Sequence, residues 1–232
     1  QGQVILPPVS SPDYNAAKST LIGVGATPAP SGFDGSSIMA EGGLSFNDGC
    51  FTNPDATYST LARNDDGFTA RVDLPFTFLF YGTAYTSVYI NNNGNITFGA
   101  GYSGFTSTGF PTTQKMIAPF WADVDTRNLA SRELKYKVFP HKLIATWPGV
   151  GYYNSMADKL DSFQVIITDG TDPEIGIGNN VAFRYAQMRW TTGSASGGVG
   201  GFGGTPATVG INAGDGINYI QIGRFGMDGY SY

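Results

Sequence analysis

The chain has 232 residues, a formal net charge of -5, and 13% charged residues against 41% hydrophobic ones. This length fits one large β domain with a sizeable core. Because the basic residues are scattered rather than concentrated on one segment, neither a nucleic-acid partner nor electrostatic docking on an acidic membrane is expected.

The single cysteine and the start of the chain bear on disulfide formation, membrane insertion and secretion. Cys50 is the single cysteine, so a disulfide within the chain is impossible, and we expect a small buried side chain there. No run reaches the roughly 18 apolar residues of a membrane helix, so membrane insertion is not expected. The start of the chain lacks the features of a signal peptide, which raises the hypothesis that Gln1 follows a cleaved one.

Residues 1–60 are rich in Pro, Gly, Ser and Ala, and they are predicted to form an irregular N-terminal arm. The exception is QVILPPV at 3–9, whose first residues favour a short strand that the prolines then end. The residues of this strand are Gln3, Val4, Ile5 and Leu6. Residues 61–232 are expected to form the β domain.

Short apolar runs broken by Gly, Asn, Asp and Pro begin at Arg71, a pattern typical of an antiparallel two-sheet sandwich. We therefore predict an all-β fold. The expected strands are 71–80, 85–91, 95–99, 116–124, 133–139, 142–147, 162–168, 180–187, 205–212 and 217–223. The best helix candidate, 154–160, is under two turns long and could equally be a loop.

Two of these strands can be argued in detail. In SVYINNNGNITF a three-residue loop at 92–94, with Gly94 in the left-handed region, pairs Ile90 with Ile96 and leaves one apolar face. In LPFTFLF, alternation directs Phe76, Phe78 and Phe80 to one side of a strand, which indicates a core element.

Ordered blocks along residues 70–223 resemble the nidogen-like (NIDO) domain of nidogens, tectorins and membrane mucins. The blocks are YGTAYTSVYINNNGNITF, FTSTGFP, MIAPFWADVDTR, LIATWPGVGYY, DKLDSFQVIITDG, VAFRYAQMRWTTGSASGG and ATVGINAGDG. The resemblance implies an extracellular module without established catalytic residues. Animal relatives carry the module among cysteine-rich repeats, so a single cysteine favours a stand-alone bacterial relative.

One acidic segment can be read in two ways. In WADVDTR an extended strand places Asp123, Asp125 and Arg127 on one face. Asp123 and Asp125 could bind calcium together with backbone carbonyls, or Asp125 could pair with Arg127. Asp65 and Asp66 could also offer oxygen ligands, although turn chemistry explains them sufficiently. No other cofactor is expected.

Catalysis is not expected. His141 is the single histidine, no G-x-S-x-G motif is present, and a solvated turn explains this residue. One histidine and one cysteine also fall short of a zinc site.

Two functions remain in competition. The first is an extracellular structural or adhesive subunit of a filament or matrix, in which the strand at 3–6 pairs with an open sheet edge of the next copy. Its partners would be further copies of itself or other matrix and surface components. The alternative is a monomeric glycan- or protein-binding module, with Tyr152 and Tyr153 stacking on sugar rings.

Overall fold

The computed structural model describes residues 51–225, and within them the predicted all-β, two-sheet sandwich is confirmed. The predictions for Gln3, Val4, Ile5, Leu6 and Cys50 concern residues outside this range. Between 51 and 225 the helical structure is one short 3-10 turn, η1 (Ser194–Ser196). No helix in this range is long and apolar enough to cross a membrane.

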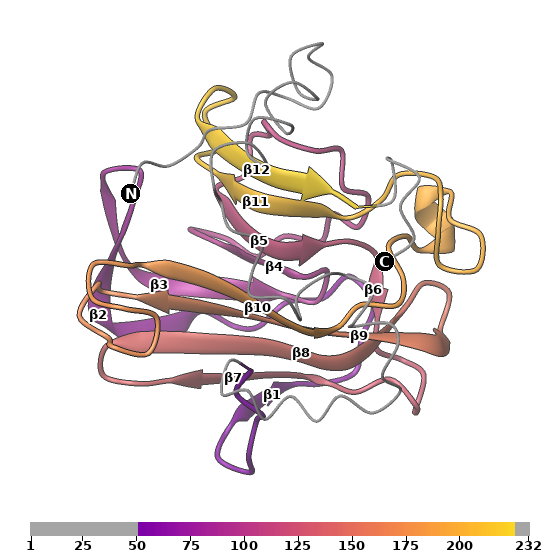
Figure 1. The fold of residues 1–232 in the computed structure, drawn as a ribbon, viewed down its shortest axis with the longest axis horizontal. Helices are drawn as coiled ribbons and strands as arrows, with labels where there is room; N and C mark the ends of the chain where they lie inside the picture. Colours follow the sequence, from indigo (N-terminus) through magenta and orange to yellow (C-terminus); the bar gives the residue numbers. More distant parts are fainter. Residues whose placement is uncertain (1–50, 226–232) are drawn as a thin grey trace, which may run out of the picture.

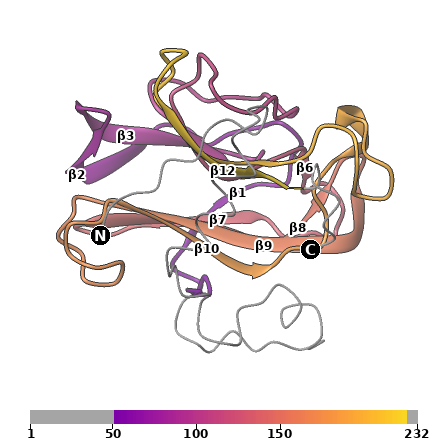
Figure 2. The same cartoon turned by 45° about the horizontal axis from the view of Figure 1, so that its top comes forward.

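Twelve strands form two antiparallel six-stranded sheets, which Figure 2 shows as separate layers. Sheet A has the order β1 (Ser59–Leu61), β7 (Leu134–Val138), β8 (Lys142–Tyr152), β9 (Met156–Thr168) and β10 (Val181–Gln187), and β6 (Val124–Asp125) also pairs with β8. Sheet B has the order β12 (Tyr219–Arg224), β11 (Thr208–Asn212), β5 (Met116–Trp121), β4 (Asn95–Thr97), β3 (Thr83–Asn91) and β2 (Val72–Phe80) (Figure 1).

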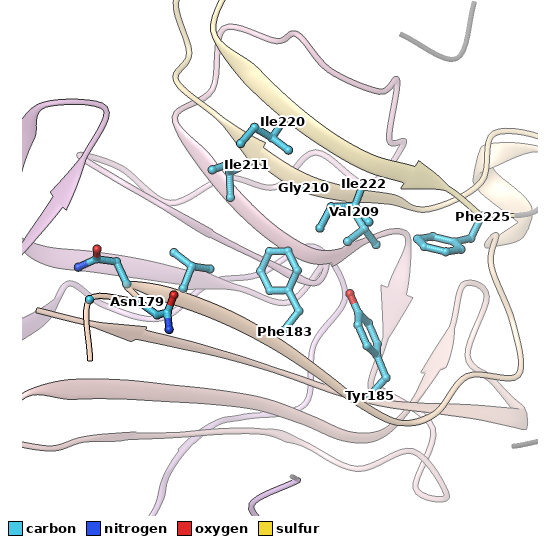
Figure 3. Close-up of a pocket in the computed structure, with 12 residues that line it drawn as sticks. Asn179, Phe183, Tyr185, Val209, Gly210, Ile211, Ile220, Ile222 and Phe225 are labelled. Atoms are coloured by element: carbon cyan, nitrogen blue, oxygen red, sulfur yellow. The ribbon is translucent and has the colours of Figure 1, made fainter. Parts of the chain in front are cut away.

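The sandwich is open along one side, where the edge strand of each sheet lies. Sheet A ends there with β10, and sheet B ends with β12. Side chains from both sheets line this opening (Figure 3). The functional analysis below begins from this side of the molecule.

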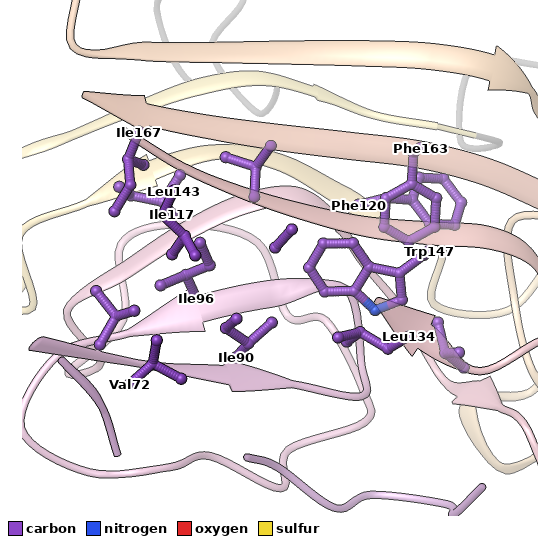
Figure 4. Packing of buried hydrophobic residues seen from close by; sticks show 14 of the residues in the cluster. Val72, Ile90, Ile96, Ile117, Phe120, Leu134, Leu143, Trp147, Phe163 and Ile167 are labelled. Carbon is purple, nitrogen blue, oxygen red and sulfur yellow. The ribbon is translucent and has the colours of Figure 1, made fainter. Parts of the chain in front are cut away.

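The main core fills the space between the sheets (Figure 4). Trp147 of β8 stacks on Phe163 of β9 with ring centroids 4.9 Å apart, and Phe120 of β5 meets Phe163 from the other sheet at 5.2 Å. The alternation predicted for β2 is confirmed, because Phe76, Phe78 and Phe80 are all buried. Inward-facing residues of both sheets therefore share one apolar layer.

The β3–β4 hairpin has the register expected from its sequence. Ile90 pairs with Ile96, and the loop consists of residues 92–94. Gly94 has φ of +72°, and a Cβ atom there would lie 1.8 Å from the carbonyl oxygen of Phe120. Only glycine satisfies both the backbone conformation and this close approach.

The segment at 154–160, a candidate for a short helix or a loop, is the end of a turn followed by the start of β9. Tyr152 pairs with Met156, so β8 and β9 form one long hairpin with a tight turn, and β9 runs on from Met156. Pairing with β8 overrides the helix-forming residues of this segment, since strand formation depends strongly on tertiary context. The segment predicted as one strand at 116–124 divides into β5 and β6, and β1 was not predicted.

Candidate functional site

An apolar groove lies between the two edge strands. Alternate residues of β10, namely Val181, Phe183 and Tyr185, form one wall. The opposite wall consists of Val209, Gly210 and Ile211 of β11 with Ile220 and Ile222 of β12, as Figure 3 shows. The groove has a volume of about 650 Å³ and its lining carries no charged side chain.

The backbone beside the groove is available for pairing. Among residues 51–225, β10 pairs only with β9, and β12 pairs only with β11. Ile222 is 51% exposed although it is a large apolar residue in a strand. An open edge next to an apolar groove is the combination that strand-addition complexes use.

The hydroxyl group of Tyr185 joins the two sheets across the groove. It donates a hydrogen bond of 2.7 Å to the backbone oxygen of Pro119 in β5. This bond links β10 to β5 of sheet B beside the groove and contributes to holding the two walls together.

A second site forms where three distant segments meet: the turn at 64–67, the hairpin loop at 92–94 and residues 122–127. The hydroxyl of Thr126 donates to the backbone oxygen of Asn64 at 2.9 Å and accepts a hydrogen bond from the Asn64 N–H at 2.9 Å. The side chain of Asn93 donates to Asp66 at 2.8 Å and accepts from the N–H of Val124 at 3.1 Å. These bonds hold the turn and the loop against residues 122–127.

Asp65, Asp66 and Asp123 form an acidic cluster at this meeting point. Each offers one carboxylate oxygen, and these oxygens all lie within 4.8 Å of one another. Asp123 is only 2% exposed, and its Oδ2 atom has no hydrogen-bond partner. The buried Oδ1 atom of Asp65 likewise has none.

Burial and mutual repulsion disfavour the charged forms in this cluster. Burial, followed by the charges of Asp65, Asp66 and Asp125, raises the pKa of Asp123 to about 7. Burial, followed by the charges of Asp125 and Asp66, raises the pKa of Asp65 to about 6. The charge of Arg127 opposes both shifts without cancelling them.

Asp125 belongs to a different set of contacts. Its carboxylate accepts hydrogen bonds from Nε and Nη2 of Arg127 at 2.9 Å and 2.5 Å, and from the N–H of Ser155 at 2.7 Å. Burial acts to raise the pKa of Asp125, but these donors outweigh it and lower the pKa. The predicted Asp125–Arg127 ion pair is present, whereas a calcium role for Asp123 and Asp125 stays a prediction.

Two further sequence expectations can be compared with the structure. His141 is exposed, and its Nδ1 atom lies 2.7 Å from Asp169, which agrees with a solvated turn histidine. The expectation that Tyr152 is exposed for sugar stacking is wrong, because this side chain is 3% exposed and its hydroxyl donates to Asp158 at 2.8 Å. The guanidinium of Arg127 lies over the ring of Tyr153, 5.6 Å from its centroid.

A sequence model described as NIDO related matches residues 43–225. The chain belongs to the NIDO-related family. The strands, the groove and the acidic cluster all lie within the matched residues. No solved structure matches this NIDO-related chain.

Curated animal relatives extend the comparison. Alpha-tectorin of Mus musculus is 32% identical over 188 residues, which cover 68% of this chain and 8% of the tectorin. Nidogen of Drosophila melanogaster is 29% identical over 133 residues, 46% of this chain and 10% of the nidogen. Dendrite extension defective protein 1 of Caenorhabditis elegans is 25% identical over 186 residues, 70% of this chain and 15% of that protein.

These similarities establish the location of the NIDO-related chain. Its relatives are extracellular matrix proteins, and the chain is extracellular or at the cell surface. The chain spans between 8% and 15% of the length of the three relatives. A bacterial host and a stand-alone arrangement stay predictions.

Sequence reasoning did not find the groove and only partly found the acidic cluster. It considered Asp65 and Asp66 separately from Asp123, because the two segments lie far apart in the sequence and meet only in the folded chain. The available signal for the groove was the apolar alternation of VAFRYAQ at 181–187, which also describes an ordinary core strand.

Proposed function

We propose that the chain is an extracellular structural or adhesive subunit that assembles by strand addition. In this proposal the strand at 3–6 of one copy enters the groove of another copy and pairs with an open edge. The observation that carries the proposal is the apolar groove between two strands that have a free edge. Further copies of the chain, or other matrix and surface components, are the partners.

The donor segment suits this groove in its chemistry. In an extended strand Val4 and Leu6 point to one side, so two branched apolar side chains can face the groove together. Pro7 and Pro8 follow directly and cannot donate backbone hydrogen bonds, which limits the paired segment to a few residues. Apolar burial and backbone pairing together would stabilise the contact.

The described chain begins on the outer face of sheet A. The hydroxyl of Thr52 accepts a hydrogen bond of 3.3 Å from Arg184 of β10, whose side chain points away from the groove that its neighbours Phe183 and Tyr185 line. The arm between residue 6 and Thr52 is long enough to pass around the edge of the sheet. A tethered segment can then occupy the groove of its own copy or that of a neighbour. Exchange between copies increases with protein concentration, whereas occupation within a copy does not.

The donor strand is tested by deleting residues 1–12 from the full chain and measuring assembly by light scattering and electron microscopy. We expect a folded monomer that no longer forms filaments or larger particles. A full chain carrying Val4→Lys and Leu6→Lys should behave in the same way. Normal assembly of the truncated chain would contradict the strand mechanism.

The acceptor groove is tested separately with a matched pair of variants. Ile222 lines the groove and is 51% exposed, whereas Ile217 is 76% exposed and lies outside the lining. Ile222→Lys should reduce assembly while Ile217→Lys leaves it unchanged. Equal behaviour of the two variants, with both folded by circular dichroism, would exclude this groove as the acceptor.

A further inference from the structure

The charges around the acidic cluster do not balance. Four carboxylates, those of Asp65, Asp66, Asp123 and Asp125, lie around the single guanidinium of Arg127. Arg127 contacts Asp125 at 2.5 Å and Asp65 at 3.1 Å. The neighbouring cation Arg63 donates instead to backbone carbonyls, among them Thr126 at 2.9 Å. A net negative charge therefore remains beside the buried carboxylates of Asp123 and Asp125.

One carboxylate oxygen of the cluster is buried without a hydrogen-bond donor. Asp123 is 98% buried, being 2% exposed, and its Oδ2 atom has no hydrogen-bond partner. A Cβ atom at Gly193 would lie 2.5 Å from this oxygen, so the chain is packed closely behind it. A buried carboxylate oxygen without a donor is costly unless a cation or a proton compensates it.

We propose that Asp65, Asp66 and Asp123 bind one calcium ion. All three ligands are carboxylate oxygens, which hard cations prefer, whereas zinc in proteins favours histidine and cysteine. Waters and backbone carbonyl oxygens would complete the shell. This ligand set replaces Asp125, whose two oxygens already accept hydrogen bonds, with Asp65 and Asp66.

The spacing of the ligands is compatible with calcium. Two oxygens that each lie about 2.3–2.6 Å from one Ca²⁺ are at most about 5 Å apart, and the three cluster oxygens lie within 4.8 Å of one another. Ligands of Mg²⁺ at about 2.1 Å must lie within about 4.2 Å. Spacing within this limit is compatible with a shared calcium ion, and the larger, more flexible coordination shell of Ca²⁺ favours it over Mg²⁺ at an irregular site.

A bound ion would fasten the turn at 64–67 to residues 122–127. These segments already share the Thr126–Asn64 hydrogen bonds, and the ion would replace carboxylate repulsion with attraction across the same contact. Because the ion binds the folded state, calcium should raise the thermal stability in proportion to the logarithm of its concentration. This inference is independent of strand addition, and the chain lacking residues 1–12 should show the same calcium response.

The test is titration of the chelator-treated full chain with CaCl2, followed by calorimetry and by thermal unfolding. We expect saturable binding and a higher Tm with calcium, and weaker binding of MgCl2, because Mg²⁺ demands near-octahedral ligands and loses its waters reluctantly. The proposal would be overturned if about 10 mM CaCl2, tenfold above the millimolar affinity typical of weak extracellular sites, produced neither binding heat nor a shift in Tm.

Variants separate binding from folding. Asp123→Asn removes one charge from a repulsive cluster, so the calcium-free protein should be at least as stable as wild type while its Tm no longer responds to calcium. Asp66→Asn should weaken binding by at least about tenfold. Asp73→Asn is the control, because the Asp73 side chain is 75% exposed and pairs with Arg71. A calcium response retained by Asp123→Asn would contradict the assignment.

Discussion

The Nε1–H group of Trp147 donates a hydrogen bond of 2.9 Å to the backbone oxygen of Asn92. Trp147 lies at the centre of sheet A, and Asn92 lies in the β3–β4 loop of sheet B. A single buried bond therefore connects the core of one sheet to the loop that borders the acidic cluster. Packing and site geometry are coupled at this contact.

Replacing Trp147 with phenylalanine removes this donor and leaves a space beside Phe163. We expect Trp147→Phe to lower the free energy of unfolding by about 2–4 kcal/mol, because a buried hydrogen bond and core volume are lost together. Urea unfolding measures this change. Leu129→Ala is the control, since Leu129 is 85% exposed and its change should have little effect.

Two glycines with nearly equal φ values allow a matched comparison. Gly94 has φ of +72°, and the Phe120 oxygen occupies the position that a Cβ atom would need. Gly82 has φ of +76° and open space around it. Gly94→Ala should cost more than about 3 kcal/mol, and Gly82→Ala about 1–2 kcal/mol for the left-handed backbone alone. Similar losses of stability in both variants would show that the close approach at Gly94 is unimportant.

Thr126 is 1% exposed and its hydroxyl both donates to and accepts from Asn64. Thr126→Val keeps the shape of the side chain and removes both hydrogen bonds, so we expect a loss of about 1–3 kcal/mol. Thr126→Ser keeps the hydroxyl and should retain most of the stability. Chemical unfolding of the two variants side by side provides the measurement.

Asp161 provides a pH-dependent contribution to stability. Complete burial raises its pKa well above the ordinary value, although the N–H groups of Arg189 and Trp190 donate to it and act in the opposite direction. The folded state therefore favours the protonated acid. This stabilisation is fully present below the unfolded pKa, about 4, and is lost as pH rises through the folded value.

Asp161→Asn should remove this contribution to the pH dependence of the free energy of unfolding. Relative to the variant, the wild type should lose stability as pH rises from 4 toward neutrality. Denaturant unfolding at a series of pH values gives the difference between the two proteins. Parallel curves for wild type and Asp161→Asn over that range would mean that Asp161 does not titrate as its burial requires.

A strand could be predicted from the sequence where its apolar residues alternate with other residues, or where a turn motif marks its end. The Phe76, Phe78 and Phe80 alternation and the Asn93-Gly94 turn each specify local geometry through neighbouring residues. β1, by contrast, has three residues and forms only because β7 lies beside it. The 156–160 segment is a strand for the same reason, since its partner in β8 is supplied by tertiary folding.

The candidate sites depend on contacts between distant segments, which local patterns do not encode. Asp65 and Asp123 meet because Thr126 and Asn93 hold three separate segments together. The groove exists because β10 and β12 are the last strands of their sheets on the same side. Composition and alternation identified the residues as acidic or apolar, and the sheet order decides which of them become neighbours.

The first and last strands of the described fold are both edge strands, β1 in sheet A and β12 in sheet B. A pulling force applied along the chain would therefore reach strands that have one neighbour each. β1 is held by three residue pairs with β7, so it would peel away before any interior strand is loaded. In a matrix under tension, this domain would extend in small steps from its margins while the centre of the sandwich stayed intact.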